Sequence, residues 1–218
     1  MPLPGALAVL ARLADRYGLV GVVSGRPVAY LRDRLAGAGE RVWLSGLYGL
    51  EATDAGRPVE VPGVRRWRPV VTEAVSAARE RFGPLVEDKG LSLTLHVRTA
   101  PQREAEVRAW AAAESARSGL VVRPAKASVE LHPPVPTDKG TVVEAAAGGM
   151  AAAAYFGDDV GDLPAFDGLD RLARTGVATV RVGVRTEEAP PELLSRADVV
   201  VDGPEGALAV FEDLAAGA

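Results

Sequence analysis

The sequence predicts an α/β protein, with a parallel sheet covered by helices and a smaller α+β domain inserted into it. At both ends of the 218-residue chain, short continuous apolar runs alternate with segments of helical spacing. Such alternation is typical of parallel strands that helices cover on both faces. In the middle of the chain, two long helical segments accompany strand-like ones, which indicates a separate α+β domain.

Prolines mark both borders of the inserted domain. Pro62 precedes it and the stretch HPPVPTD follows it, and proline interrupts both helices and strands. We therefore expect a core domain of residues 1–62 and 138–218 and an inserted domain of residues 63–137.

The elements can be justified in chain order. Helical spacing over residues 7–17 and 27–35 predicts two helices, and the apolar run over residues 19–23 predicts a strand between them. The inserted domain is predicted to have helices over 64–81 and 102–118 and strands over 91–97, 120–123 and 128–131. The last part is predicted to have helices over 139–147, 163–173 and from 205 onward, and strands over 152–156, 178–184 and 198–201.

Composition excludes several classes of protein. Lys and Arg number 25 against 29 Asp and Glu, so the formal charge is −4, and no basic block points to nucleic-acid binding. Cys is absent, which excludes disulfides, a thiolate nucleophile and a Cys-ligated zinc, and two His leave little room for a His-rich metal site. Any metal must therefore lie mostly on carboxylates.

The chain is expected to be cytoplasmic. Its longest uncharged apolar stretch, residues 145–156, is shorter than the roughly 20 residues that a membrane span needs. The opening MPLPGALAVLARLADR does not have the pattern of a secretory signal. We expect no membrane or nucleic-acid partner, a phosphate-bearing small molecule as ligand, and a monomer or weak homodimer.

Lysine is rare in this chain. Only Lys89, Lys126 and Lys139 occur, and the other 22 basic residues are Arg. Because an ammonium and a guanidinium group are not interchangeable at a tight site, each lysine is a candidate functional residue. The alternative is that the three lysines are ordinary surface charges.

The first candidate motif is VVSGRP, in which the strand over residues 19–23 leads into Ser24, Gly25 and Arg26. Pro27 occupies the position favoured for the start of a helix. A hydroxyl beside the free N–H groups of a helix start can bind phosphate. The alternative is that Ser24 is an ordinary helix cap.

The second candidate motif is TDKGTVVE, which places Lys139 in the first turn of a helix. A cation there opposes the helix dipole unless an anion lies nearby. A bound phosphate would supply that anion, and a solvated lysine is the alternative.

The third candidate motif is YFGDDVGDLPAF, where a buried strand ends at Gly157 and is followed by Asp158, Asp159 and Asp162. Three carboxylates at the carboxyl end of a strand suit Mg²⁺, which takes one or two carboxylates with water and substrate phosphate. Helix capping explains one of the three aspartates but not all of them.

The order of these motifs resembles the haloacid-dehalogenase superfamily and, in detail, the trehalose-6-phosphate phosphatase family. LSGLYGLE, VEDKGLSLTLHVR and ASVELHP are similar to further stretches of that family. The resemblance implies a Rossmannoid core with an inserted cap domain. It also implies Mg²⁺-dependent hydrolysis of trehalose 6-phosphate in trehalose biosynthesis.

The resemblance also implies roles for individual residues. Ser24 would hold the phosphoryl group with Gly25 and Arg26 beside it, and Lys139 would neutralise its charge. Asp158 would bind Mg²⁺, and Asp162 would support that site. Asp159 is a candidate metal residue as one of the three carboxylates of the third motif. The cap residues that would face the sugar or close over the phosphate are Glu87, Lys89, His96, Arg98, Lys126 and Glu130. Alternation along residues 91–97 allows only one set of side chains to face a ligand.

The chain departs from this family at one motif. The family's aspartate nucleophile and its acid/base aspartate lie in a DxDGT motif at the end of the first strand, and no such motif is present. Asp15, Asp33 and Asp54 do not follow apolar strands and are no substitutes. We therefore expect this 218-residue chain to be inactive as it stands.

The missing strand has a structural consequence. In the superfamily it lies centrally, between the counterparts of residues 19–23 and 152–156, so its loss would leave a gap of about 10 Å. Three explanations stay open: a longer protein with a different start, a truncated inactive remnant, or a sheet closed by exchange with a second copy. Two other functions also stay open, namely another sugar-phosphate phosphatase and a sugar-phosphate-binding pseudo-phosphatase without catalysis.

Overall fold

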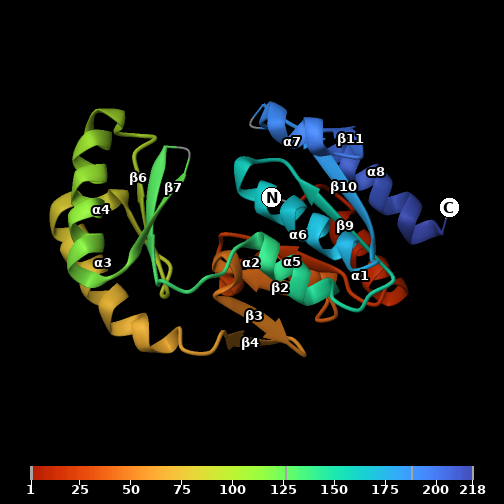
Figure 1. The fold of residues 1–218 in the computed structure, drawn as a ribbon, viewed down its shortest axis with the longest axis horizontal. Coiled ribbons are helices and arrows are strands. Elements are labelled where there is room, and N and C mark those ends of the chain that lie inside the picture. The colour runs from red at the N-terminus through yellow and green to blue at the C-terminus, as the bar shows by residue number, and fades with distance from the viewer. Residues whose placement is uncertain (1, 126, 188, 218) are drawn as a thin grey trace. The chain divides into compact units, whose positions relative to one another are not determined.

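The computed structural model describes residues 2–125, 127–187 and 189–217, which divide into two compact units (Figure 1). The core unit comprises the residues up to Val59 together with those from Thr137 onward, and the inserted unit comprises Glu60–Pro136. The expected borders at residues 62 and 138 thus lie within a few residues of the structural ones.

The first part of the core unit contains a mixed sheet of strand order β1-β2-β3-β4. β1 pairs with β2 in parallel, and β2 pairs with β3 in antiparallel orientation. Leu7, Leu10 and Ala14 of the first helix pack with Val28 and Leu31 of the second in one apolar cluster. The elements are α1 (Ala6–Arg16), β1 (Gly21–Val23), α2 (Val28–Leu35), β2 (Trp43–Gly46), β3 (Glu51–Asp54) and β4 (Arg57–Glu60).

The second part of the core unit is a parallel sheet of order β11-β10-β9 with helices on both faces. Tyr155 packs against the cluster of α5 and α6, whereas the next residue, Phe156, contacts Phe211 of α8 at 4.5 Å between ring centroids. The elements are α5 (Lys139–Ala147), β9 (Ala152–Gly157), α6 (Leu163–Arg174), β10 (Ala178–Arg185), α7 (Pro191–Arg196), β11 (Val199–Asp202) and α8 (Gly203–Ala216).

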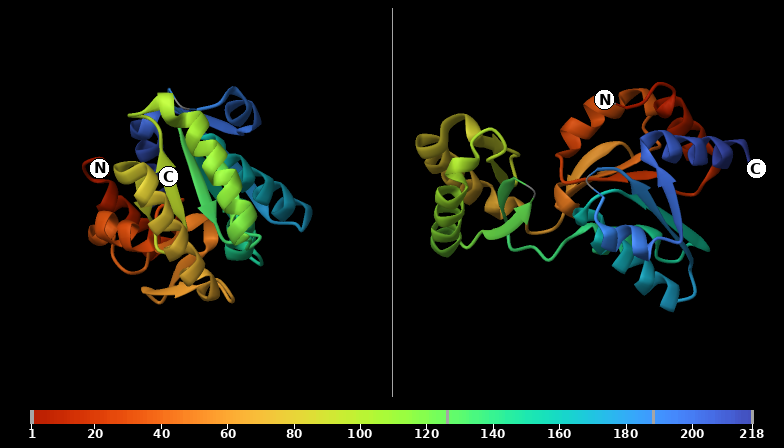
Figure 2. Two further views of the ribbon diagram at one scale, coloured as in Figure 1. Left: turned by 90° about the vertical axis from the view of Figure 1, so that its left-hand side faces the viewer. Right: turned by 90° about the horizontal axis from the view of Figure 1, so that it is seen from above.

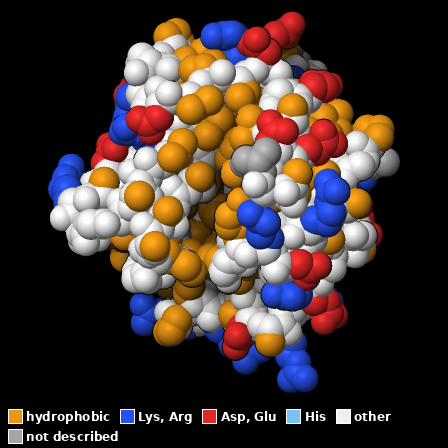
Figure 3. All heavy atoms as spheres, turned by 90° about the vertical axis from the view of Figure 1, so that its right-hand side faces the viewer, with side chains coloured by type: hydrophobic (Ala, Val, Ile, Leu, Met, Phe, Trp, Pro, Cys, Tyr) orange, Lys and Arg blue, Asp and Glu red, His pale blue; other side chains and the backbone are white. Residues whose placement is uncertain are grey.

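The two core sheets are separate among the described residues. β1 is hydrogen-bonded to β2 alone and β9 to β10 alone, so each has one edge without a strand partner there. This separation of the strands at residues 19–23 and 152–156 was expected from the sequence. Figure 3 shows hydrophobic side chains gathered along a hollow on one side of the molecule. Leu19, Val180 and Val199, at the amino ends of core strands, are each about two-fifths exposed, at 39%, 42% and 46%.

The inserted unit is a four-stranded antiparallel sheet of order β5-β6-β8-β7 with two helices on one face (Figure 2). Its core includes Phe82 of α3, Val107 of α4 and Leu93, Leu95 and Leu131 of the sheet. The elements are α3 (Arg68–Phe82), β5 (Val86–Asp88), β6 (Leu93–His96), α4 (Glu104–Ser118), β7 (Val121–Ala125) and β8 (Ser128–His132).

The predicted helices and parallel strands are confirmed, with ends shifted by a few residues. The segment predicted as a helix from residue 64 begins with a 3₁₀ turn at Arg65–Trp67. The elements missing from the prediction are β2, β3, β4, β5 and α7, which have three to six residues each. None of these segments contains a continuous apolar run or a repeat of apolar residues long enough to be recognised. No helix in the described part of the chain is long and apolar enough to cross a membrane.

Candidate functional site

The centre of the candidate site is a buried ion pair. Lys139, at the first position of α5, donates a hydrogen bond from Nζ to Asp162 Oδ1 at 2.6 Å, and both side chains are almost fully buried. The anion expected next to Lys139 is therefore present in the protein as a carboxylate. Asp138 caps α5 and accepts a hydrogen bond from the Thr141 amide at 2.8 Å, which also offsets the positive end of the helix dipole.

Asp162 has all its acceptor positions engaged. Oδ1 also accepts a hydrogen bond from the Tyr155 hydroxyl at 2.7 Å, and Oδ2 accepts the amides of Asp158 at 3.1 Å and Asp159 at 3.3 Å. Burial alone raises the pKa of Asp162, but Lys139, Tyr155 and the amide of Asp158 more than offset it, so the pKa is lowered. Burial, together with the charge of Asp162, raises the pKa of Tyr155 well above its usual value. At neutral pH the cluster therefore holds the Asp162 carboxylate and a neutral Tyr155 phenol.

Close helix packing fixes the position of Lys139. A Cβ atom at Gly140 would lie 2.1 Å from the Pro164 carbonyl oxygen, and one at Gly168 would lie 2.5 Å from the Gly140 carbonyl oxygen. Helices α5 and α6 therefore approach one another through glycines. The Lys-Gly pair of the DKG motif thus places the ammonium group and allows the helix to reach Asp162.

The aspartates after β9 have different surroundings. Asp159 accepts the amide of Asp162 in a capping box, so its carboxylate serves the turn Val160–Asp162. Burial, with the charge of Asp162, raises the pKa of Asp159. Of the three aspartates expected around Mg²⁺, Asp162 thus binds Lys139, Tyr155 and two amides, and Asp159 caps a turn.

The described residues do not make a complete metal site. They include no group of three or more His, Asp or Glu side chains placed to hold an ion. Mg²⁺ needs few protein carboxylates, because water and substrate phosphate can fill the other positions. Asp158 is exposed directly after β9, and its amide donates to Asp162 Oδ2.

The Ser24 turn differs from the expected open helix start. Helix α2 begins at Val28, with Pro27 in the capping position, and the Val28 amide donates to Glu51 Oε1 at 2.5 Å. The Ser24 hydroxyl accepts the Arg26 amide at 3.1 Å. A phosphate at this turn could not use the Val28 amide, because the Glu51 carboxylate already occupies it.

The inserted unit has a polar face opposite its helices. Lys89 donates to Glu130 Oε2 at 3.1 Å, and both side chains are buried. His96 Nε2 lies 2.7 Å from Glu87 Oε2 on the neighbouring strand. Leu93, Leu95 and Val97 point into the core. The expected alternation along β6 is therefore confirmed, and it leaves His96 on the polar face.

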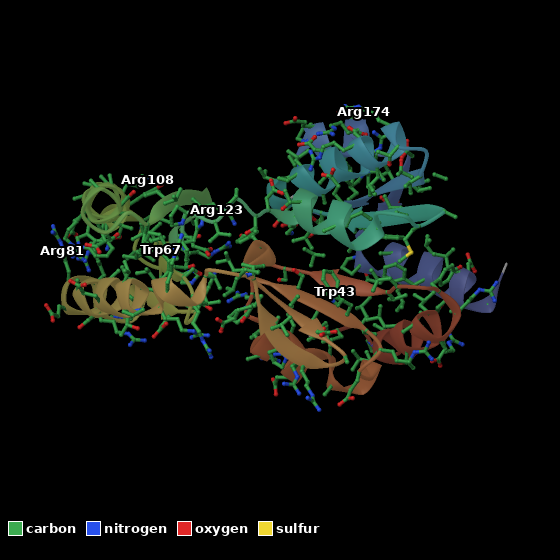
Figure 4. The ribbon with its side chains drawn as sticks, turned by 60° about the horizontal axis from the view of Figure 1, so that its bottom comes forward. Trp43, Trp67, Arg81, Arg108, Arg123 and Arg174 are labelled. Carbon is green, nitrogen blue, oxygen red and sulfur yellow. The ribbon has the colours of Figure 1, made fainter. Side chains whose placement is uncertain are left out.

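Two other cap residues were predicted, Arg98 and Lys126. Arg98 is exposed and follows β6 in a turn. Lys126 lies outside the described residues. Figure 4 marks Arg123, which stands opposite Glu130 in the register of β7 and β8.

Three residues in or near the site were missed by the sequence reasoning, namely Tyr155, Tyr48 and Glu51. Tyr155 resembles a strand residue and gives no sign of its bond to Asp162. Tyr48 and Glu51 lie in LSGLYGLE, which was singled out only as a resemblance. The glycines around Tyr48 were the available signal, because such spacing marks a backbone turn.

A family model described as trehalose-phosphatase matches residues 1–198 of the chain. The trehalose-phosphate phosphatase of Mycobacterium ulcerans (strain Agy99) is 32% identical over 179 residues, which are 76% of this chain and 45% of that protein. That of Mycobacterium tuberculosis (strain ATCC 25618 / H37Rv) is 31% identical over 177 residues, 75% of this chain and 44% of that protein. The match thus covers less than half the length of these relatives.

Solved structures agree in fold. One, described as a trehalose-6-phosphate phosphatase related protein, has a TM-score of 0.80 at 18% identity and covers 96% of this chain and 86% of that one. The C-terminal domain of trehalose-6-phosphate phosphatase from C. albicans has a TM-score of 0.73 at 21% identity, covering 100% of this chain and 84% of that one. The family model and the curated relatives, with this fold, show that the chain belongs to the trehalose-phosphatase family of haloacid-dehalogenase-like proteins.

Proposed function

We propose that this chain supplies the cap and most of the catalytic core of a trehalose-6-phosphate phosphatase, which hydrolyses trehalose 6-phosphate to trehalose and phosphate. The observation that carries the proposal is the buried Lys139–Asp162 pair in a chain of the trehalose-phosphatase family. A buried lysine held in one geometry offers a preorganised positive charge, which is what phosphoryl transfer requires of a protein.

In this proposal, Lys139 and Ser24 hold the transferring phosphoryl group, and the backbone of Gly25 and the side chain of Arg26 lie beside it. Asp162 orients Lys139, and Tyr155 and two amides share the carboxylate's charge. A lysine ammonium carries three donors. Among the described residues, the bond to Asp162 uses one of them, and the others are proposed to bind a phosphoryl oxygen.

Asp158 would hold Mg²⁺ together with carboxylates from the absent DxDGT strand. When bound, the ion offsets charge on the phosphoryl oxygens and helps to orient them. Asp159 and Asp162 would act through the backbone of the loop that carries Asp158. Both aspartates make hydrogen bonds to amides of this loop.

The missing nucleophile strand is proposed to pair between β1 and β9. Each of these strands has an open edge among the described residues, and both run parallel to their partners. An inserted strand would use backbone groups at both edges. The aspartate at its end would attack phosphorus, and the acid/base aspartate would protonate the departing trehalose oxygen. Water would then hydrolyse the aspartyl phosphate.

The polar face of the inserted unit is proposed to bind the sugar. Glu87 and Glu130 offer carboxylate acceptors for hydroxyl groups, and Lys89 and His96 offer donors. Thr94 extends this polar set, with its hydroxyl 3.5 Å from Glu130 Oε2. Arg98 and Lys126 are proposed to close over the phosphate.

The test compares this chain with a version extended by upstream residues that carry a DxDGT strand. Phosphate release from trehalose 6-phosphate is measured with Mg²⁺ for both, and a Lys139→Met variant of the extended version is the control. We expect activity in the extended version alone, reduced by at least a hundredfold in the variant. Equal rates with and without Lys139 would overturn the assignment of the site.

Two further measurements separate the alternatives. A panel of other sugar phosphates would reveal a different substrate, if one is hydrolysed faster than trehalose 6-phosphate. Calorimetry with trehalose 6-phosphate would reveal a binding protein without catalysis, if both versions bind it and neither releases phosphate.

A further inference from the structure

The segment Gly46–Glu51, which connects β2 to β3, makes several hydrogen bonds to the Ser24 turn and to the start of α2. Leu47 donates its amide to the Arg26 carbonyl at 3.1 Å, and Tyr48 donates its amide to the Ser24 carbonyl at 3.0 Å. Two residues of the turn are thus tied to two consecutive residues of this segment, Gly46–Glu51. Glu51 adds the bond to the Val28 amide at the start of α2.

The Tyr48 ring lies directly on Gly25. A Cβ atom at Gly25 would stand 2.5 Å from Cζ and 2.6 Å from the hydroxyl oxygen of Tyr48, so a larger residue there would displace this ring. Gly46 is equally tight, because a Cβ there would lie 2.7 Å from the Val28 nitrogen. The turn and the segment are therefore complementary in shape as well as hydrogen-bonded.

Two residues of the segment Gly46–Glu51 have an unfavourable backbone conformation. Leu47 and Tyr48 have φ of 51° and 56°, in the left-handed region that disfavours residues with a side chain. Leu47 is 1% exposed, so its side chain is an anchor in the core. Two successive strained residues persist only where the surroundings hold them, and such strain gathers at functional sites.

The same segment also contacts the helix that carries Lys139. A Cβ atom at Gly49 would lie 2.5 Å from Val142 Cγ2 of α5 and 3.3 Å from Thr137 Cβ. The Ser24 turn follows β1 of the first core sheet, whereas α5 packs against β9 of the second. These two sheets are not hydrogen-bonded to one another among the described residues. Segment Gly46–Glu51 is therefore a physical link between the two groups proposed to hold phosphate.

We propose that Tyr48 is a positioning residue: its ring, held by the strained turn, fixes the Ser24–Arg26 turn in the conformation that binds the phosphoryl group. This inference rests on the proposed function, since it concerns the same anion site. It assigns to Tyr48 no contact with substrate, and its effect acts through Gly25.

The test is a double-mutant cycle read by the binding of inorganic phosphate to the 218-residue chain. Gly25→Ala forces a Cβ into the ring, and Tyr48→Asn removes the ring while asparagine still tolerates the left-handed backbone. We expect each single variant to weaken phosphate binding at least tenfold. In the Tyr48→Asn background, Gly25→Ala is expected to weaken it no more than about twofold further. Tyr17→Asn, at an exposed tyrosine beside α8, is the matched control and should bind phosphate like the parent chain.

The outcomes separate the two proposals. If the parent chain binds phosphate and the two substitutions act independently, Tyr48 does not act through Gly25, and the inference is wrong while the anion site stands. If the parent chain binds no phosphate, both the anion site and the role of Tyr48 are overturned. Thermal unfolding of each variant, within a few degrees of the parent, confirms that the cycle reports on the turn rather than on global stability.

Discussion

Lys139 illustrates what single residues reveal in a sequence. Its rarity and its place in the first turn of a helix predict that an anion lies beside it. The identity of the anion is not predictable in this way, because Asp162 is 23 positions away and the two meet only when α5 packs on α6. The same holds for Tyr155 and Glu51, whose hydrogen bonds depend on tertiary packing.

The buried pair makes a prediction for stability. Lys139→Met leaves the buried Asp162 carboxylate without its cation, which we expect to lower the free energy of unfolding by about 3–5 kcal/mol. Lys139→Met combined with Asp162→Asn should cost less than the sum of the two single variants, because the second substitution removes the unpaired charge. Urea unfolding of the four proteins measures the coupling, expected at about 1–3 kcal/mol.

An exposed ion pair provides the control for this cycle. Arg41 and Asp15 are 3.0 Å apart, with both side chains 69% exposed. Arg41→Met is expected to change the free energy of unfolding by no more than about 0.5 kcal/mol. Additive effects of the Lys139 and Asp162 substitutions would contradict a coupled buried pair.

At the scale of elements, the long helices could be predicted because their apolar residues repeat over many positions, and strands such as β9 because they are short apolar runs between helices. The strands β2, β3 and β4 could not, because their sequences WLSG, EATD and RPVE contain no such run, and two of them form a small antiparallel addition. The hairpin nevertheless matters for the site. It begins at Glu51, whose carboxylate fixes the start of α2.

The junction of β10 and β11 makes a prediction for pH dependence. Arg181 donates to Asp198 from its amide at 2.8 Å and from Nε at 3.0 Å, and these bonds lower the pKa of Asp198 to about 2. A carboxyl whose pKa is lower in the folded state stabilises the fold above its ordinary pKa of 3.8 and loses this contribution as the pH falls toward 2. Asp198→Asn should therefore lower the melting temperature at pH 7. The difference from the parent chain should shrink between pH 4 and pH 2.5. A difference that stays constant over this range would show that the charge of Asp198 is not the cause.

At the scale of the whole molecule, the inserted unit has the larger continuous core. Its buried cluster joins helices α3 and α4 to the sheet, whereas the core unit divides its buried residues between separate clusters around two sheets. This division of the core unit was expected from the sequence, because the strand that lies between the counterparts of β1 and β9 in the superfamily is missing. What it could not indicate is how the two halves stay associated, which depends on contacts such as α1 with α8 and Gly49 with α5.

This difference predicts two unfolding transitions, and the three tryptophans can report on them. Trp43 lies in the core unit, and Trp67 and Trp110 lie in the inserted unit, as Figure 4 shows for the first two. In a Trp67→Phe, Trp110→Phe variant, fluorescence follows the core unit alone, and in a Trp43→Phe variant it follows the inserted unit. We expect the core unit to unfold at the lower urea concentration, because the open edges of β1 and β9 leave apolar side chains and backbone groups in water. Coincident midpoints in the two variants would mean that the units unfold together. In the version carrying the added strand, the Trp43 midpoint should rise while the midpoint of the inserted unit stays unchanged, since only the core sheets gain a partner.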